Sequence, residues 1–173
     1  ALAKSLGGGK CAMAAMVATR KVYMKAYGTP KTAMIHAQAT FGGIGEACIT
    51  AIEGLNVMYD EDLIGNAERT GGYLLEQLEG LKANSPQIVK DGSGRGCMIG
   101  LEFQDCSQAR PGLLGPMGGV LDEKLKGSLS GFVGAELLRD HDVLVAFTEY
   151  NRNVIRLEPP LICGREHVDQ FIT

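Results

Sequence analysis

The chain has 173 residues, of which 45% are hydrophobic, and its formal net charge is −3. This length can bury a core and corresponds to about one domain. Acidic and basic residues are interspersed, which argues against a nucleic-acid surface or a polybasic membrane patch. No apolar stretch approaches the roughly 20 residues that cross a bilayer. We therefore expect a protein that acts on small molecules, without nucleic-acid or membrane partners.

A glycine-rich turn and a strand are the first elements expected in chain order. The segment KSLGGGKCAMAAMVAT predicts a loop with unusual backbone angles that leads into a buried strand, and Lys4 lies in that loop. Next we expect a short helix closed by Gly28 and Pro30, followed by an irregular stretch that ends at Gly42 and Gly43. This irregular stretch is a candidate binding loop.

Two consecutive helices are predicted in the middle of the chain. Apolar residues recur at helical spacing from Ile44 to Met58, and a second set of this kind runs from Leu63 to Leu81. Pro86 removes a backbone donor and so ends the second helix. The change of pattern places a boundary near Asp60.

The last part of the chain alternates between strand and helix patterns. Strands are expected at 87–103 around a glycine turn, at 142–147 and at 153–161, and helices at 132–142 and from 165 onward. This alternation predicts a small α/β or α+β unit packed on one sheet. The segment 105–130 is rich in Gly, Pro and Ser, which predicts a long loop.

The cysteines and histidines form no recognisable ligand motif. Five cysteines are scattered without a C-x-x-C pair, which argues against a disulfide framework and against a zinc site. The three histidines are far apart in sequence. This usage fits a reducing cytoplasm, and we assign no metal.

The lysine of the first turn carries the first chemical signal. By itself, a lysine beside glycines is read as a solvated surface residue. The run AKSLGGG from Ala3 to Gly9 resembles the K-x-L-G-G-G signature of class III aminotransferases, which depend on pyridoxal phosphate (PLP). The resemblance implies that Lys4 holds PLP as a Schiff base. The ordinary lysine pKa of about 10.4 makes the amine a poor nucleophile, and a nearby cationic ring makes it lose its proton more easily.

A second motif follows in the order found in this family. HAQATFGG, from His36 to Gly43, resembles the family's H-x-x-T-F-G-G with one extra residue before the threonine. The resemblance implies that Thr40 hydrogen-bonds the cofactor phosphate of the neighbouring subunit, and hence that the enzyme is a homodimer. The backbone amides around Gly42 and Gly43 could donate to the same phosphate. Without the resemblance, a turn that binds no ligand is the simpler interpretation.

The third motif lies near the C-terminus. NVIRLEPPL resembles the family's I-R-x-x-P-P-L, and the resemblance implies that Arg156 receives a substrate carboxylate. An arginine fork matches a carboxylate in bidentate geometry, although a single strand-borne arginine is more often a salt-bridge partner. DGSGRGCMIGLEF also resembles a family segment, and the C-terminal region is most similar to putrescine aminotransferases. The chain departs from the family pattern at Lys10, Cys11 and Ala12, and at Ser93.

The resemblance implies an α/β fold of the aspartate-aminotransferase type, PLP fold type I. Residues 1–60 would be the C-terminal part of the large PLP-binding domain, and 61–173 a linking helix with the small C-terminal domain. The family's partner of the pyridine nitrogen and its aromatic stacking residue precede the lysine, so we expect this chain to be a fragment.

The implied activity is transfer of an amino group from an amine or ω-amino compound to a keto acid or aldehyde. A PLP-dependent aminomutase or racemase of the same fold is one alternative, and product analysis with pyruvate or 2-oxoglutarate would separate the two. A non-catalytic dimerisation domain is the other, which the joint presence of Lys4, Thr40 and Arg156 disfavours.

Overall fold

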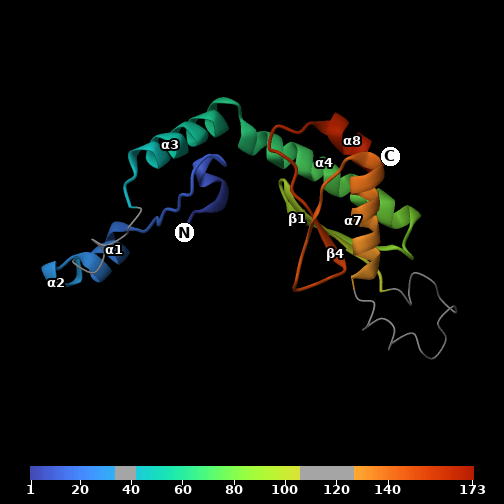
Figure 1. The fold of residues 1–173 in the computed structure, drawn as a ribbon, viewed down its shortest axis with the longest axis horizontal. Helices are drawn as coiled ribbons and strands as arrows, with labels where there is room; N and C mark the ends of the chain where they lie inside the picture. The colour runs from blue at the N-terminus through green and yellow to red at the C-terminus, as the bar shows by residue number, and fades with distance from the viewer. Residues whose placement is uncertain (34–41, 106–126) are drawn as a thin grey trace. The chain divides into compact units, whose positions relative to one another are not determined.

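The computed structural model describes residues 1–33, 42–105 and 127–173. Contacts divide the chain into two compact units, Ala1–Asp62 and Leu63–Thr173. Figure 1 shows the helices and strands of both units. The predicted loop at 105–130 falls almost wholly outside the described residues.

The first unit consists of helices joined by extended segments. Its elements are η1 (Lys4–Gly7), α1 (Arg20–Tyr27), α2 (Pro30–Ala33) and α3 (Gly45–Asp60). Gly28 ends α1 as predicted, but Pro30 opens α2, because proline is favoured at the first position of a helix.

The strand predicted after the glycine turn is wrong. Leu2 and Ala15 form an isolated antiparallel bridge, with N–H to O distances of 2.7 and 2.8 Å in the two directions. A strand needs a neighbour along its length to satisfy its backbone groups. Within residues 1–33, the structure describes no strand pairing besides this bridge. The apolar run therefore stays extended and largely exposed.

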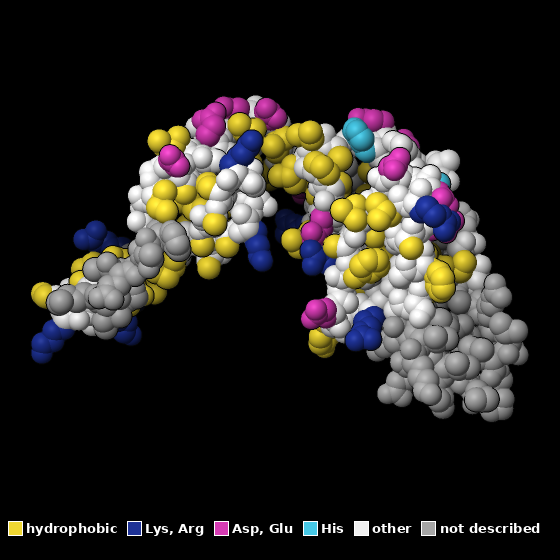
Figure 2. Space-filling view, in the orientation of Figure 1, with side chains coloured by type: hydrophobic (Ala, Val, Ile, Leu, Met, Phe, Trp, Pro, Cys, Tyr) yellow, Lys and Arg dark blue, Asp and Glu magenta, His cyan; other side chains and the backbone are white. Residues whose placement is uncertain are grey.

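The two helices predicted around Asp60 are confirmed as α3 and α4 (Leu63–Asn84), which two residues separate. The α3 helix buries Ala47 and Ala51. Several of its large apolar side chains are exposed, among them Ile49 at 70% and Tyr59 at 73%, and Figure 2 shows hydrophobic side chains on the surface of this part of the chain.

The second unit is one antiparallel sheet with helices. Its elements are α4, β1 (Val89–Arg95), β2 (Met98–Phe103), α7 (Ser128–His141), β3 (Ala146–Phe147), β4 (Val154–Leu157) and α8 (Arg165–Ile172). The strand order is β1-β2-β4-β3. The strand, glycine turn and strand predicted at 87–103 are confirmed as β1 and β2, whose turn contains Gly96 at φ +55°. Figure 1 shows α4 and α7 beside the strands.

One face of this sheet builds the core. In β2 every second residue is buried, and in β4 Ile155 and Leu157 follow the same alternation. The α4 helix adds Leu74 and Leu78, which are one turn apart on the same side of the helix. Apolar residues of α7 and α8 pack against the same cluster, so the helices cover this face. The opposite face carries the alternate residues of the strands.

Candidate active site

Lys4 lies at the start of η1 in an unusual backbone conformation. Its φ is +61°, in the left-handed region that side chains other than glycine rarely adopt, and the residue is exposed. The next left-handed residues, Gly8 and Gly9, have no Cβ and adopt this conformation freely. A non-glycine residue held in this conformation is a reason to look for a function.

The glycine turn is held against the N-terminal half of α3. A Cβ placed on the buried Gly7 would lie 2.9 Å from Cys11 Sγ, so a larger residue there would require the Cys11 side chain to move. The Cys11 thiol in turn lies 3.9 Å from the carbonyl oxygen of Ala47 in α3. The 3-10 helix that begins at Lys4 therefore contacts a helix of the same unit.

The second predicted site segment leads into that helix. Gly42 and Gly43 are exposed in the turn before α3, and Gly43 has φ +75°. A Cβ on Gly43 would meet no atom within 4 Å, so the conformation and not the space requires glycine there. Ile44, the N-cap residue of α3, provides no side-chain cap hydrogen bond. The backbone amides of a helix start are suited to an anion. Thr40 and His36 lie outside the described residues.

Arg156 lies on the face of the sheet opposite the core. It is a β4 residue between the buried Ile155 and Leu157, and its backbone pairs with Gly100 on one side and Ala146 on the other. Small neighbours on both sides leave its side chain uncovered. Arg156 belongs to the second unit, whereas Lys4, Gly42 and Gly43 belong to the first.

The Arg156 guanidinium already holds a carboxylate of its own chain. Its Nε lies 3.0 Å from Glu158 Oε1, and a terminal nitrogen lies 2.9 Å from Oε2. These hydrogen bonds to Glu158 raise the pKa of Arg156 above its usual value. Sequence reasoning missed Glu158, which follows the end of β4 two residues after Arg156.

The chain that follows Arg156 is tied to α4. Asn66 Nδ2 donates to the carbonyl oxygens of Leu161 at 2.6 Å and Cys163 at 2.9 Å. Thr70 Oγ1 donates to the same Cys163 carbonyl oxygen at 3.0 Å. These contacts join residues more than ninety positions apart, so no local pattern could have predicted them. They fix the segment that carries Pro159 and Pro160 behind the arginine.

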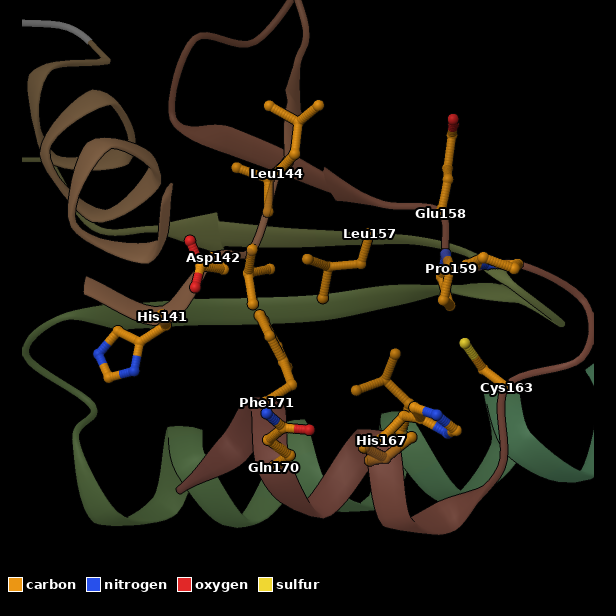
Figure 3. Close-up of a pocket in the computed structure, with 15 residues that line it drawn as sticks. His141, Asp142, Leu144, Leu157, Glu158, Pro159, Cys163, His167, Gln170 and Phe171 are labelled. Carbon is orange, nitrogen blue, oxygen red and sulfur yellow. The ribbon is translucent and has the colours of Figure 1, made fainter. Parts of the chain in front are cut away.

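A pocket of about 490 Å³ opens on the core side of the same strand. Its lining includes Leu144, Leu157 and Phe171, and Figure 3 shows Glu158 extending away from Cys163 and His167. Successive residues of a strand point to opposite faces, so the Arg156 side chain does not share this pocket with Leu157. Glu158, the hydrogen-bond partner of Arg156, does line the pocket, so the pocket borders the predicted carboxylate site.

The match to a known protein family covers the three segments that contain Lys4, Thr40 and Arg156. The family model of class III aminotransferases matches residues 1–173. The chain belongs to the class III aminotransferases. Members of this family depend on PLP, and their fold is PLP fold type I.

Relatives with known names agree with this assignment. The aminotransferase PigE of a Serratia species (strain ATCC 39006) is 31% identical to this chain over an alignment 200 residues long. The alignment covers 99% of this chain and 23% of that protein. The ornithine δ-aminotransferase of Plasmodium falciparum has the same fold, with a TM-score of 0.72 and 21% identity over 98% of this chain and 36% of that one.

A third relative was solved with its cofactor. It is an amine transaminase from an uncultivated Pseudomonas species in the PLP-bound form, with a TM-score of 0.62 and 29% identity over 82% of this chain and 28% of that one. This chain thus spans between 23% and 36% of the length of these three relatives. Among its described residues, no helix is long and apolar enough to cross a membrane.

Proposed function

We propose that the complete protein transfers an amino group from an amine or ω-amino compound to a keto acid or aldehyde, with PLP as its cofactor. The observation that carries the proposal is Lys4, an exposed lysine in a left-handed conformation at the K-x-L-G-G-G position. Residues 1–60 would then end the large domain, and 61–173 would form the linking helix and the small domain.

The described residues of the first unit suit this cofactor. PLP, when bound, supplies an electron sink for the carbanion at the substrate Cα. Lys4 offers the amine that holds the cofactor, and the glycines beside it bring the backbone close without side-chain obstruction. The same amine could also take the proton from the substrate Cα. One side chain thus serves both binding and proton transfer.

The phosphate end of the cofactor would be bound across a dimer interface. The Thr40 hydroxyl and the backbone amides around Gly42 and Gly43 supply neutral donors suited to a phosphate. We propose a homodimer in which these donors serve the partner's cofactor, because two-fold interfaces are the commonest in such assemblies. We propose the cytoplasm as the compartment, since Cys11, Cys48, Cys97 and Cys163 are free thiols.

Complementation between two defective chains tests the shared site. Lys4→Ala dimers and Thr40→Val dimers should each lose activity, because each lacks one member of every site. After the two are mixed and subunits exchange, one site in each heterodimer has both residues, and activity should return to roughly a quarter of the wild-type value. Unmixed dimers taken through the same exchange are the control. Proven heterodimers without recovery would contradict a site built from two chains.

Arg156 is proposed to bind the carboxylate of the keto acid and of α-amino acid donors. Arg156→Ala should raise the Michaelis constant for the acceptor 2-oxoglutarate by roughly tenfold or more, since a charge-assisted bidentate contact is lost. The Michaelis constant for an aliphatic aldehyde should change little, because this substrate has no carboxylate. Steady-state kinetics with both acceptors make the comparison. Equal losses for the two would indicate a structural arginine.

A further inference from the structure

A second arginine of the sheet, Arg95, lies on the same open face as Arg156. It is the last residue of β1 and is paired with Met98 of β2. Residues directly opposite each other in an antiparallel pair share a face of the sheet. Met98 is 70% exposed and precedes the buried Ile99, so it belongs to the face opposite the core. Arg95 is exposed and belongs to that face as well.

The strand register places the two arginines within reach of one small molecule. Arg156 is paired with Gly100, which is two residues after Met98, or roughly 7 Å along β2. Since β1 and β4 flank β2 on its two sides, Arg95 and Arg156 are also two strand spacings apart, roughly 10 Å. The two displacements are nearly perpendicular, which puts the Cα atoms about 12 Å apart. Two long arginine side chains on one face can close most of this gap.

Small and apolar residues lie between the two arginines. Ser93 of β1 is paired with Gly100, so the row that leads to Arg156 carries little side-chain bulk. Met98, in the neighbouring row, offers an exposed apolar side chain beside Arg95. A molecule with two carboxylates joined by methylene groups matches this order of positive charge, apolar surface and positive charge.

The acidic residues of β1 and β2 are already paired with lysines. Asp91 lies 2.8 Å from Lys82 Nζ, and Glu102 lies 2.8 Å from Lys90 Nζ. The hydrogen bonds from these lysines lower the pKa of both carboxyl groups, which therefore stay charged and engaged. Within the described ranges of the chain, Arg95 makes no ion pair. Its charge is thus open to an external anion.

We propose that Arg95 is a specificity-determining residue that binds the second carboxylate of a dicarboxylic keto acid whose first carboxylate is bound by Arg156. The inference rests on the proposed transaminase function and on Arg156 as its carboxylate-binding residue. It deepens that function by naming the class of acceptor, a short dicarboxylic keto acid in preference to a monocarboxylic one.

The test compares acceptors with two, one and no carboxylates in the full-length, PLP-loaded protein. Wild type, Arg95→Ala, Arg95→Lys and Arg152→Ala are assayed in steady state with 2-oxoglutarate, pyruvate and butanal. Inhibition by the unreactive acids glutarate and butyrate is measured in parallel, and urea unfolding of each variant reports stability. Arg152 is an exposed arginine of the loop between β3 and β4, so its variant removes the same charge from the same unit as a matched control.

Arg95→Ala should raise both the Michaelis constant for 2-oxoglutarate and the inhibition constant of glutarate by roughly fivefold, because an exposed charge-assisted contact is lost. The constants for pyruvate, butanal and butyrate should not change, since these molecules have no second carboxylate. Arg95→Lys should keep part of the preference for the dicarboxylates, because it keeps the charge without the fork. Arg152→Ala should behave as wild type, and the urea midpoints should agree.

Equal shifts for 2-oxoglutarate and pyruvate, or no shift for either, would overturn the inference. A lowered urea midpoint with equal losses for all acceptors would also overturn it, because Arg95 would then hold another part of the full-length chain. A wild-type protein that transfers no amino group to any acceptor would instead overturn the proposed function. Transfer to pyruvate and butanal without an effect of Arg95 would leave that function standing, so the two failures are distinct.

Discussion

Replacing Lys4 by alanine should abolish the absorption band that PLP gives the full-length protein near the boundary of the ultraviolet and visible regions. The same variant should lose amino-group transfer by roughly a thousandfold or more, because one amine both holds the cofactor and moves the Cα proton. Spectra recorded during PLP titration, followed by single-turnover assays, provide the two measurements.

Lys10 provides the matched control for this experiment. It is an exposed lysine at the other end of the same glycine turn, so Lys10→Ala removes an equal charge from the same segment. The Lys10→Ala protein should keep both the band and the activity. A Lys4→Ala protein that keeps them, or a Lys10→Ala protein that loses them, would show that the motif has been assigned to the wrong lysine.

Gly71→Ala should strongly destabilise the second unit, whereas Gly72→Ala should not. A Cβ on the buried Gly71 would overlap the carbonyl group of Gly96 and lie 2.7 Å from its Cα. Gly96 has φ +55° in the turn between β1 and β2, so this turn cannot yield without strain. Overpacking of this kind costs about 3 kcal/mol of unfolding free energy. A Cβ on Gly72 meets no atom within 4 Å. Alanine there should raise the free energy of unfolding by about 0.5–1 kcal/mol, because alanine favours a helix interior more than glycine does.

Urea unfolding of the two variants, side by side with wild type, measures this difference. The change of residue type and the helix are the same in both, so helix propensity cancels and the contact with Gly96 remains. The midpoint should fall for Gly71→Ala and stay or rise for Gly72→Ala. Equal midpoints for the two variants would mean that α4 does not pack on the β1–β2 turn as described.

Elements that depend on local pattern could be predicted from the sequence. Helix α3 and helix α4 follow from apolar spacing, and β1 and β2 follow from a glycine turn between two strand-like runs. In each case the residues that decide the structure are neighbours in the sequence. The strand predicted after Gly9 was wrong. Its apolar run suits a strand, but a strand also needs a neighbouring strand to pair with, and the run itself does not reveal whether one exists.

The parts that depend on distant contacts could not be predicted. The placement of β4 between β2 and β3, the hydrogen bonds from Asn66 to the Leu161 carbonyl and the approach of Gly71 to Gly96 all join remote positions. The candidate site divides in the same way. Lys4 and Arg156 were indicated by motif resemblance, whereas the left-handed conformation of Lys4 and the bond to Glu158 came from the structure.

The central claim is that Lys4 is the lysine that holds PLP, and reductive trapping tests it most directly. The full-length protein is loaded with PLP, reduced with borohydride, digested and mapped by mass spectrometry for the pyridoxyl-modified lysine. We expect stoichiometric modification of the peptide that contains Lys4, with Lys10 unmodified. Modification of Lys10 in place of Lys4, or the absence of any modified lysine in a protein that has bound PLP, would contradict the claim.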